Sequence, residues 1–307
     1  MATTAPSATH GLRTDLFTVN PVRHQRGFSL LEVSIGSALG FVVLAVAVQL
    51  LLSVQQNLRL ANAYARLNEN ARAAMTLMRS HIRAAGSLPC IPSALDSLLS
   101  ESDATELLAI SAPGEVTPIR GDVLSVQSFR SLPAETLPAS GAIVVAATAG
   151  GDDCVIFEAP AAAEAHPVLA ASPRLSIAEQ TRYYLDQSVG QSGLSSLFRA
   201  RQSRGGQREE LVEGVYDLRI AYGVDQTGNG AMNAFLPAEQ VSDWAAVQAV
   251  RLWLLVGSGG PVVGSGTLPH NLVWPDGEPV QFETTQSSAN QNLYRVFSTT
   301  VAIERQM

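Results

Sequence analysis

The stretch Arg26-Gly27-Phe28-Ser29-Leu30-Leu31-Glu32 divides this 307-residue chain into two very different kinds of sequence. Residues 1–27 carry three arginines against one aspartate and show no helical or strand period. They are therefore predicted to be a disordered basic leader. The run Val33–Leu58 contains no charged residue. At about 1.5 Å per residue, a helix of that length crosses a hydrocarbon layer about 30 Å thick.

Three interpretations compete for this segment, and Glu32 distinguishes between them. A secretory signal has an apolar core of only about 7–15 residues before a small-x-small cleavage site. Ala61-Asn62-Ala63 offers such a site, but the uncharged run is far longer. An uncleaved anchor explains the length and leaves Glu32 without a role. A carboxylate at the membrane boundary costs about 2–3 kcal/mol, so its presence indicates a function. The basic leader predicts that residues 1–27 stay in the cytoplasm and that the bulk of the chain lies outside.

The third interpretation rests on the combination of basic leader, Gly-Phe, an early glutamate and a long apolar helix. This combination resembles the class III signal of type IV pilins and type II secretion pseudopilins. In that family a prepilin peptidase cuts after the glycine and methylates the new N-terminal aromatic residue. The resemblance implies that Gly27 ends the leader, that Phe28 is the N-methylated terminus and that Glu32 is the fifth mature residue. It also implies that Glu32 meets the N-terminal amine of a neighbouring subunit and fixes the register of assembly, since an unpaired buried charge is costly.

Two features of the apolar run bear on the kind of subunit. Major pilins often carry a proline about two-thirds of the way along this segment, where the present chain has Gln49. Gly36 and Gly40 form a G-x-x-x-G, which allows close approach of a second helix. They are equally well explained as small residues of a membrane helix, and both interpretations stay open.

The helix is predicted to run from about 29 to 85, with a transmembrane or filament-core half at 28–58 and an amphipathic half at 59–86. In the second half, residues at steps of three and four predict one stripe that packs on the protein's own sheet. The stripe comprises Leu60, Tyr64, Leu67, Ala71, Met75, Met78 and Ile82. Arginines mostly off the stripe are expected to face solvent or a neighbouring subunit. Gly86 followed by Pro89 predicts the helix end.

Residues 90–307 are predicted to form a β-rich globular domain, because short β-type runs are broken there by Gly, Pro and Ser. The expected fold class is α+β, with the long helix packed on an antiparallel β-rich, pilin-like periplasmic domain. Short helical turns are expected within 91–109 and 174–180, and loops at 159–173 and 257–280. The predicted strands are Asp122–Phe129, Ala142–Ala147, Val155–Glu158, Thr181–Leu185, Ser196–Ala200, Glu210–Tyr222, Ala246–Val256 and Leu293–Ile303.

Several phrases of this domain, in their order along the chain, resemble the PilW-type minor pilins. They are Gly121–Val126, Tyr183–Leu185, Ser196–Arg199, Glu210–Val215 with Leu218–Asp225, the strand around Val250–Leu252, and Tyr294–Glu304. The resemblance implies a low-abundance structural subunit that primes type IV pilus assembly and sits near the pilus tip. It implies a single pass through the bacterial inner membrane, a periplasmic C-terminal domain, and later an extracellular pilus.

The partners implied by the resemblance are prepilin peptidase, the inner-membrane assembly platform, other minor pilins, the major pilin and a tip adhesin. Two alternatives stay open. A J-type minor pseudopilin of a type II secretion system shares the signal, the size and the β-rich fold. A permanently anchored periplasmic binding or sensor protein would merely retain an apolar helix.

Other candidate sites are few. Cys90 and Cys154 each follow a loop-forming stretch and either pair as a disulfide or stay separate thiols. Asp225-Gln226-Thr227-Gly228-Asn229-Gly230 resembles the front of a calcium loop through Asp225 and Asn229, but it lacks the bidentate glutamate at the expected distance. A Gly-rich turn is the favoured interpretation, and no cofactor is expected. Arg120-Gly121-Asp122 spells an adhesion motif, but it leads straight into a predicted strand, which favours a turn.

Composition restricts the function classes further. The chain has 20 basic and 27 acidic residues, a formal charge of −7. Such a balance argues against nucleic acid as a partner, because phosphate binding needs a basic surface. Only 15% of the residues are charged, which is low for a soluble domain. No G-x-S-x-G, Cys-His or paired-carboxylate arrangement is apparent, so we expect no enzyme activity.

Overall fold

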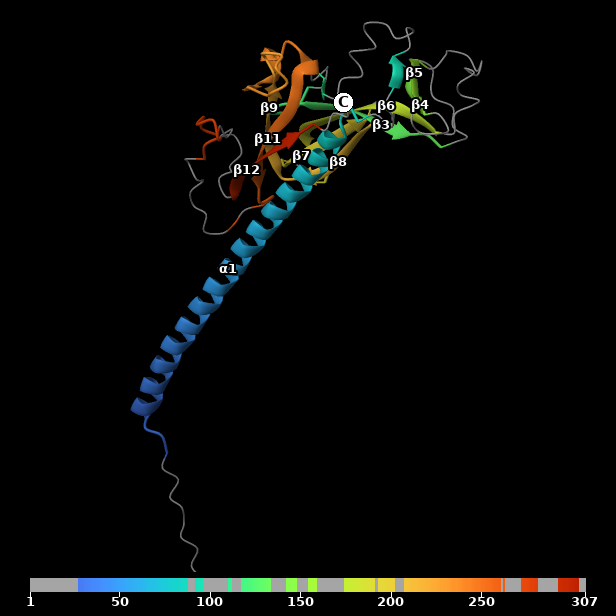
Figure 1. Cartoon of the computed structure of the whole chain (residues 1–307). Coiled ribbons are helices and arrows are strands. Elements are labelled where there is room, and N and C mark those ends of the chain that lie inside the picture. The colour runs from blue at the N-terminus through green and yellow to red at the C-terminus, as the bar shows by residue number, and fades with distance from the viewer. Residues whose placement is uncertain are drawn as a thin grey trace, which may run out of the picture. The chain divides into compact units, whose positions relative to one another are not determined.

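A computed structural model describes most of the chain from Gly27 to Ile303. The described residues are 27–87, 92–95, 110–111, 117–133, 142–147, 154–158, 174–190, 193–201, 207–260, 262, 272–280 and 292–303. The chain divides into two compact units, Met1–Val54 and Gln55–Met307. One long helix followed by antiparallel β-sheets makes up the described part, which confirms the predicted α+β class (Figure 1).

Helix α1 spans Leu30–Ala84, 55 residues, which confirms the predicted helix to within a residue at each end. Its first described backbone bond runs from Val33 N–H to the Ser29 carbonyl oxygen, 3.1 Å away. The helix ends where Gly86 adopts a positive φ of 67° and donates its N–H to the carbonyl oxygen of Gln127 at 3.2 Å. Glycine reaches that left-handed conformation without steric cost, so Gly86 stops the helix as the sequence predicts.

The first sheet runs in the order β1-β5-β4-β6-β3-β2, with β7 pairing β6 and β8 pairing β7. The pairings are antiparallel apart from the parallel pair β1 and β5. The strands are β1 (Pro92–Leu95), β2 (Ile110–Ser111), β3 (Leu124–Ser131), β4 (Ile143–Ala147), β5 (Cys154–Glu158), β6 (Arg174–Gln187), β7 (Ser195–Arg201) and β8 (Arg208–Glu213).

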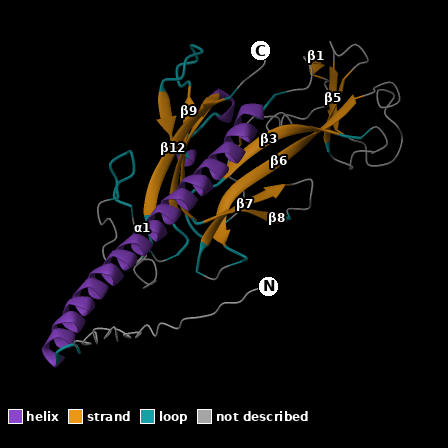
Figure 2. Ribbon diagram, turned by 90° about the horizontal axis from the view of Figure 1, so that it is seen from below, coloured by secondary structure: helices purple, strands orange, loops and turns teal. Residues whose placement is uncertain are grey.

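The second sheet is wholly antiparallel and has the order β10-β9-β11-β12. Its strands are β9 (Val215–Val224), β10 (Ala234–Leu236), β11 (Val247–Gly257) and β12 (Tyr294–Ala302), with the 3-10 turns η2 (Ala238–Gln240) and η3 (Trp244–Ala246) between β10 and β11. In Figure 2 the C-terminal half of α1 crosses both sheets, with β9 and β12 on one side and β3 and β6 on the other.

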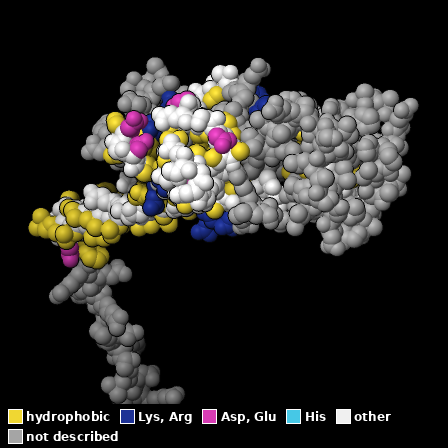
Figure 3. Space-filling view, turned by 45° about the horizontal axis from the view of Figure 1, so that its top comes forward, with side chains coloured by type: hydrophobic (Ala, Val, Ile, Leu, Met, Phe, Trp, Pro, Cys, Tyr) yellow, Lys and Arg dark blue, Asp and Glu magenta, His cyan; other side chains and the backbone are white. Residues whose placement is uncertain are grey.

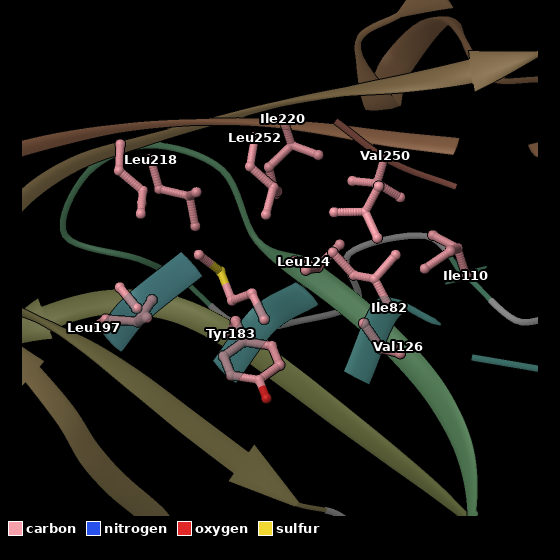
Figure 4. Close-up of a cluster of buried hydrophobic side chains, with 14 of the residues drawn as sticks. Ile82, Ile110, Leu124, Val126, Tyr183, Leu197, Leu218, Ile220, Val250 and Leu252 are labelled. Carbon is pink, nitrogen blue, oxygen red and sulfur yellow. The ribbon is translucent and has the colours of Figure 1, made fainter. Parts of the chain in front are cut away.

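The main core lies between α1 and the two sheets. Figure 4 shows Ile82 beside Leu124 and Val126 of the first sheet, across from Val250 and Leu252 of the second. The buried helix residues recur at steps of three and four along one seam, which is the pattern of a helix packed on one face. They are Ala63, Leu67, Ala71, Ala74, Met78 and Ile82.

The seam is narrower than the predicted stripe. Leu60 and Tyr64 were expected in it, but they are 37% and 43% exposed, and Met75 is only partly buried. Ala63 and Ala74 take the inner positions instead, because alanine lets the helix backbone approach the sheets closely. The prediction followed the large apolar residues and therefore assigned the N-terminal end of the stripe, Leu60 and Tyr64, to the buried face, which is wrong.

Two local predictions are wrong. Residues 174–180 form the first half of β6 rather than a helical turn. Within the stretch 91–109, Pro92–Leu95 is a strand, and the helical turns expected elsewhere in 91–109 lie outside the described residues. The single strand expected at Glu210–Tyr222 is two strands, because Gly214 has a φ of 77° and interrupts it. The chain moves from one sheet to the other at this glycine.

Candidate functional site

The residues of the N-terminal signal lie at the very start of α1. Gly27, Phe28 and Ser29 precede the helix, and Phe28 is 80% exposed. Glu32 lies in the first helical turn and is exposed, and its carboxylate makes no hydrogen bond or ion pair with any residue that the structure describes. The first turn is the positive end of the helix dipole, which favours a carboxylate there. A positively charged group introduced at Phe28 would thus lie about one turn from Glu32.

Most side chains in the first half of α1 are apolar and exposed, and Figure 3 shows them gathered on the face in view. Its most apolar 18-residue window has a mean hydropathy of 2.4 with none of it buried, so it is long and apolar enough to cross a membrane. The Ser34 hydroxyl donates to the carbonyl oxygen of Leu31 at 2.8 Å, and Ser37 donates to that of Ser34 at 2.9 Å. Both hydroxyls are therefore satisfied within the helix, as an apolar medium requires.

Gly36 and Gly40 leave one strip of this helix without side-chain bulk. A Cβ built on either residue would meet nothing within 4 Å. The two glycines and Glu32 are spaced four residues apart, so they share one helix face. A second helix could approach closely along this strip and reach the carboxylate at its end.

In the second unit, polar contacts from the helix supplement the apolar seam. Asn70 donates from Nδ2 to the carbonyl oxygen of Glu213 at 2.9 Å, just before the chain passes between the sheets. Gly214 then donates to the Ser195 carbonyl oxygen at 2.9 Å and accepts from the Gly257 N–H at 2.8 Å. The helix is thereby joined to the point where the two sheets meet. The sequence offered no signal for this contact, because an asparagine among helical polar residues looks solvent-exposed.

His81 takes part in a hydrogen-bonded group that the sequence also did not reveal. Its Nδ1 lies 2.5 Å from the hydroxyl oxygen of the buried Tyr183. Burial raises the pKa of Tyr183 to about 12, so the phenol keeps its proton and donates it to the imidazole. Burial, then the neighbouring charges of Arg199 and Arg201, lower the pKa of His81 below its usual value. A neutral histidine is the form that fits this site.

Gly121 and Asp122 of the adhesion-like triplet are used within the fold. Gly121 has a φ of 73°, and a Cβ there would overlap the carbonyl oxygen of Leu218. Asp122 donates its N–H to that same oxygen at 2.7 Å, and its carboxylate accepts from Ile220 N–H at 2.7 Å. This confirms the predicted turn before a strand. Through these two hydrogen bonds Asp122 also occupies the edge of β9 at Leu218 and Ile220, which β10 does not reach.

Asp225 organises the Gly-rich loop between β9 and β10. Its two carboxylate oxygens accept hydrogen bonds from the N–H groups of Thr227, Gly228 and Gly230 at 2.6–3.0 Å. Desolvation opposes ionisation, but the bonds from Gly230 and Thr227 outweigh it and lower the pKa of Asp225. Asn229 likewise accepts from Ala231 N–H at 2.9 Å. The turn interpretation is confirmed, and calcium binding by Asp225 and Asn229 stays a prediction. Among the described residues, no three His, Cys, Asp or Glu side chains converge on a metal position.

The predicted disulfide falls outside what the structure describes. Cys90 is not among the described residues, and Cys154 is described only as part of the backbone of β5. The pairing of the two stays a prediction.

In the part of the chain that the structure describes, one helix that could cross a membrane is followed by a β-rich domain. The family model for type IV pilus-assembly protein W matches residues 182–304, less than half of the chain. The match spans the second half of β6 through β12 and confirms, over these residues, the resemblance that the ordered phrases predicted. It supports a role of the pilin type in type IV pili.

Among solved structures, a type IV-like pilin from Thermus thermophilus matches with 14% identity and a TM-score of 0.33. The match covers 78% of this chain and 97% of the other. Because the TM-score is below 0.5, the fold assignment rests on the described helix and strands and not on this similarity. No curated protein matches the chain.

Proposed function

We propose that this chain is a minor pilin, made as a precursor that prepilin peptidase cuts after Gly27 and methylates at Phe28. The precursor spans the bacterial inner membrane once, with its leader in the cytoplasm and its β-rich domain in the periplasm. The mature subunit enters a type IV pilus near the tip, where residues 28–58 lie in the filament core. Its partners are then other minor pilins, the major pilin, a tip adhesin and the assembly platform.

The observation that carries this proposal is the position of Glu32. Glu32 is in the first turn of the helix and is the only charged residue between Leu30 and Leu58, where most side chains are apolar and exposed. A membrane or a helix bundle disfavours such a group unless a positive partner meets it. Cleavage after Gly27 creates that partner, since it leaves a new amine on Phe28. The match to the type IV pilus-assembly protein W family over residues 182–304 supports the same role.

Mass spectrometry of the N-terminal peptide from the native protein tests the processing step. We expect a peptide that begins at Phe28 and carries one methyl group on its amine. An intact leader, or a start at Tyr64 after a conventional signal cut, would contradict the proposal. A Gly27→Leu variant is the matched control, because it is expected to keep its leader while leaving the helix unchanged.

Two further outcomes separate the alternatives. A J-type pseudopilin carries the same methylated terminus, so it is distinguished by location: the tagged subunit would be absent from sheared pili and required for type II secretion. A permanently anchored binding or sensor protein would retain its leader or an unmethylated terminus and would never leave the membrane fraction.

A further inference from the structure

The second sheet ends in β12, a long strand whose outer edge pairs with no other strand that the structure describes. β12 pairs with β11 over nine consecutive residues, from Ala249 with Ala302 to Gly257 with Tyr294, without a register shift. Among the described residues no strand lies on its other side. Ser298, Thr300 and Ala302 are exposed along the strand.

The register shows which backbone groups face that edge. Ile303 donates its N–H to Gln248 O, and Leu293 accepts from Ser258 N–H, so odd-numbered residues of β12 face β11. In an antiparallel pair the alternate residues direct their N–H and C=O groups the other way. Val296, Ser298 and Thr300 therefore present main-chain donors and acceptors to the open side, where an added strand would pair with them.

The edges formed by β10, β9 and β8 are protected. β10 is only three residues long and is followed by Pro237. The rest of the β9 edge is closed by Asp122, and β8 carries several charges and an irregular register against β7. Short, charged or bulged edges are the usual devices against unwanted pairing. β12 has no proline, no bulge and no charge among its edge-facing residues, and no strand in the described part of the chain pairs with that edge.

Charge identifies the kind of strand that fits. Arg79 of α1 donates to Thr299 Oγ1 at 2.8 Å, and the Arg295 guanidinium lies 5.4 Å from the centre of the Phe297 ring. Neither arginine has a carboxylate partner among the described residues, although the whole chain carries a formal charge of −7. Residues 295 and 299 are about 13 Å apart along the strand. Acidic side chains four residues apart on a partner strand would meet both arginines.

A second copy of this chain fits the edge poorly. Antiparallel pairing of two β12 strands centred on Ser298 would bring Arg295 of one copy towards Arg79 of the other. Like charges opposite each other destabilise a strand pair. We propose that the open edge of β12 binds an extended segment of a different protein chain, which adds a strand and carries two acidic side chains four residues apart on the helix side. This inference is independent of the processing at Phe28.

The test uses the full-length protein in detergent micelles and a fluorescent nine-residue peptide. The peptide alternates valine and threonine, with glutamates at its third and seventh positions, and a second peptide has lysines there. Ser298→Pro removes one edge-facing N–H without touching the pairing with β11, and Ser298→Thr is its matched control. The melting temperature of each variant confirms that it is folded.

We expect the glutamate peptide to bind and Ser298→Pro to weaken its binding about tenfold, as loss of a main-chain hydrogen bond and disturbance of its neighbours would do. Ser298→Thr should bind the glutamate peptide as the unaltered protein does. Arg295→Glu should weaken binding of the glutamate peptide but not binding of the lysine peptide. The proposal is overturned if Ser298→Pro binds unchanged, if neither peptide binds at millimolar concentration, or if the lysine peptide binds equally well. A β12-dependent dimer, abolished by Ser298→Pro, would overturn it in favour of a second copy.

Discussion

At His81, burial and the charges of Arg199 and Arg201 all act against protonation of the imidazole, while Glu179 alone acts in favour. The pKa of His81 in the folded chain therefore lies below its unfolded value of 6.5. The unfolded chain takes up a proton first as the pH falls, so acid favours unfolding. We expect the stabilisation by neutral His81 to be complete above pH 6.5 and to be lost as the pH falls towards the folded pKa. Thermal melts between pH 7.5 and 5 measure this loss.

His81→Gln is the control for that prediction. Glutamine can still accept the hydrogen bond from Tyr183, but it does not titrate, so the variant should lose less stability than the unaltered chain over this pH range. If both proteins show the same pH dependence, the acid sensitivity arises elsewhere. The sequence alone could not predict this response, because the histidine stands among helical arginines and its partner is 102 residues away.

At the scale of elements, the seam of α1 depends on small residues as much as on large ones. Ala74 is fully buried against the sheets, whereas Ala73 beside it is exposed. Ala74→Leu should therefore overpack the interface and cost about 1–3 kcal/mol of unfolding free energy, because a close-packed interior has no room for the added atoms. Ala73→Leu makes the same chemical change on the solvent side and should stay within about 0.5 kcal/mol. Urea denaturation of the full-length protein in detergent measures both, and equal effects would contradict the assigned seam.

The elements also show how far the sequence could be interpreted. The helix bounds were predictable because Gly86 and Pro89 end an uninterrupted helical pattern, and most strands stood out as β-type runs between turn residues. β6 was only half predicted, since Ala178-Glu179-Gln180 favours a helix locally. Its pairing with β3, β4 and β7 overrides that preference. The passage between sheets at Gly214 could not be predicted either, because a strand sequence does not specify which sheet it joins.

For the candidate site, residues with local motifs could be predicted from the sequence, whereas residues defined by distant contacts became visible only in the structure. Gly27, Phe28 and Glu32 were predicted from local spacing, which needs no tertiary contact to be recognised, and their roles stay predictions. Asn70 and His81 were missed because their partners are distant in the chain. The open edge of β12 could not be predicted from the sequence either, because an edge strand and a central strand of the same composition differ only in their neighbours.

At the scale of the whole molecule, one carboxylate links processing to assembly in the proposed function. Glu32 lies in the first turn of a helix that is otherwise uncharged up to Leu58, so in a bundle of such helices it has to meet a positive group. We expect Glu32→Ala to be cleaved after Gly27 and methylated at Phe28 as usual, because the peptidase acts before any neighbour is present. Its incorporation into pili should fall, since a neighbouring subunit then lacks the partner for its N-terminal amine.

Glu69→Ala is the matched control, because Glu69 is an exposed acid on the same helix but in the unit that holds the β domain. Mass spectrometry of the membrane fraction reports processing, and immunoblotting of sheared pili for the tagged chain reports assembly. Glu69→Ala should match the unaltered chain in both measurements. Glu32→Gln is expected to resemble Glu32→Ala, because the amide lacks the charge that pairs with the amine. Normal incorporation of both Glu32 variants would refute the register role, and loss of cleavage would instead assign Glu32 to recognition by the peptidase.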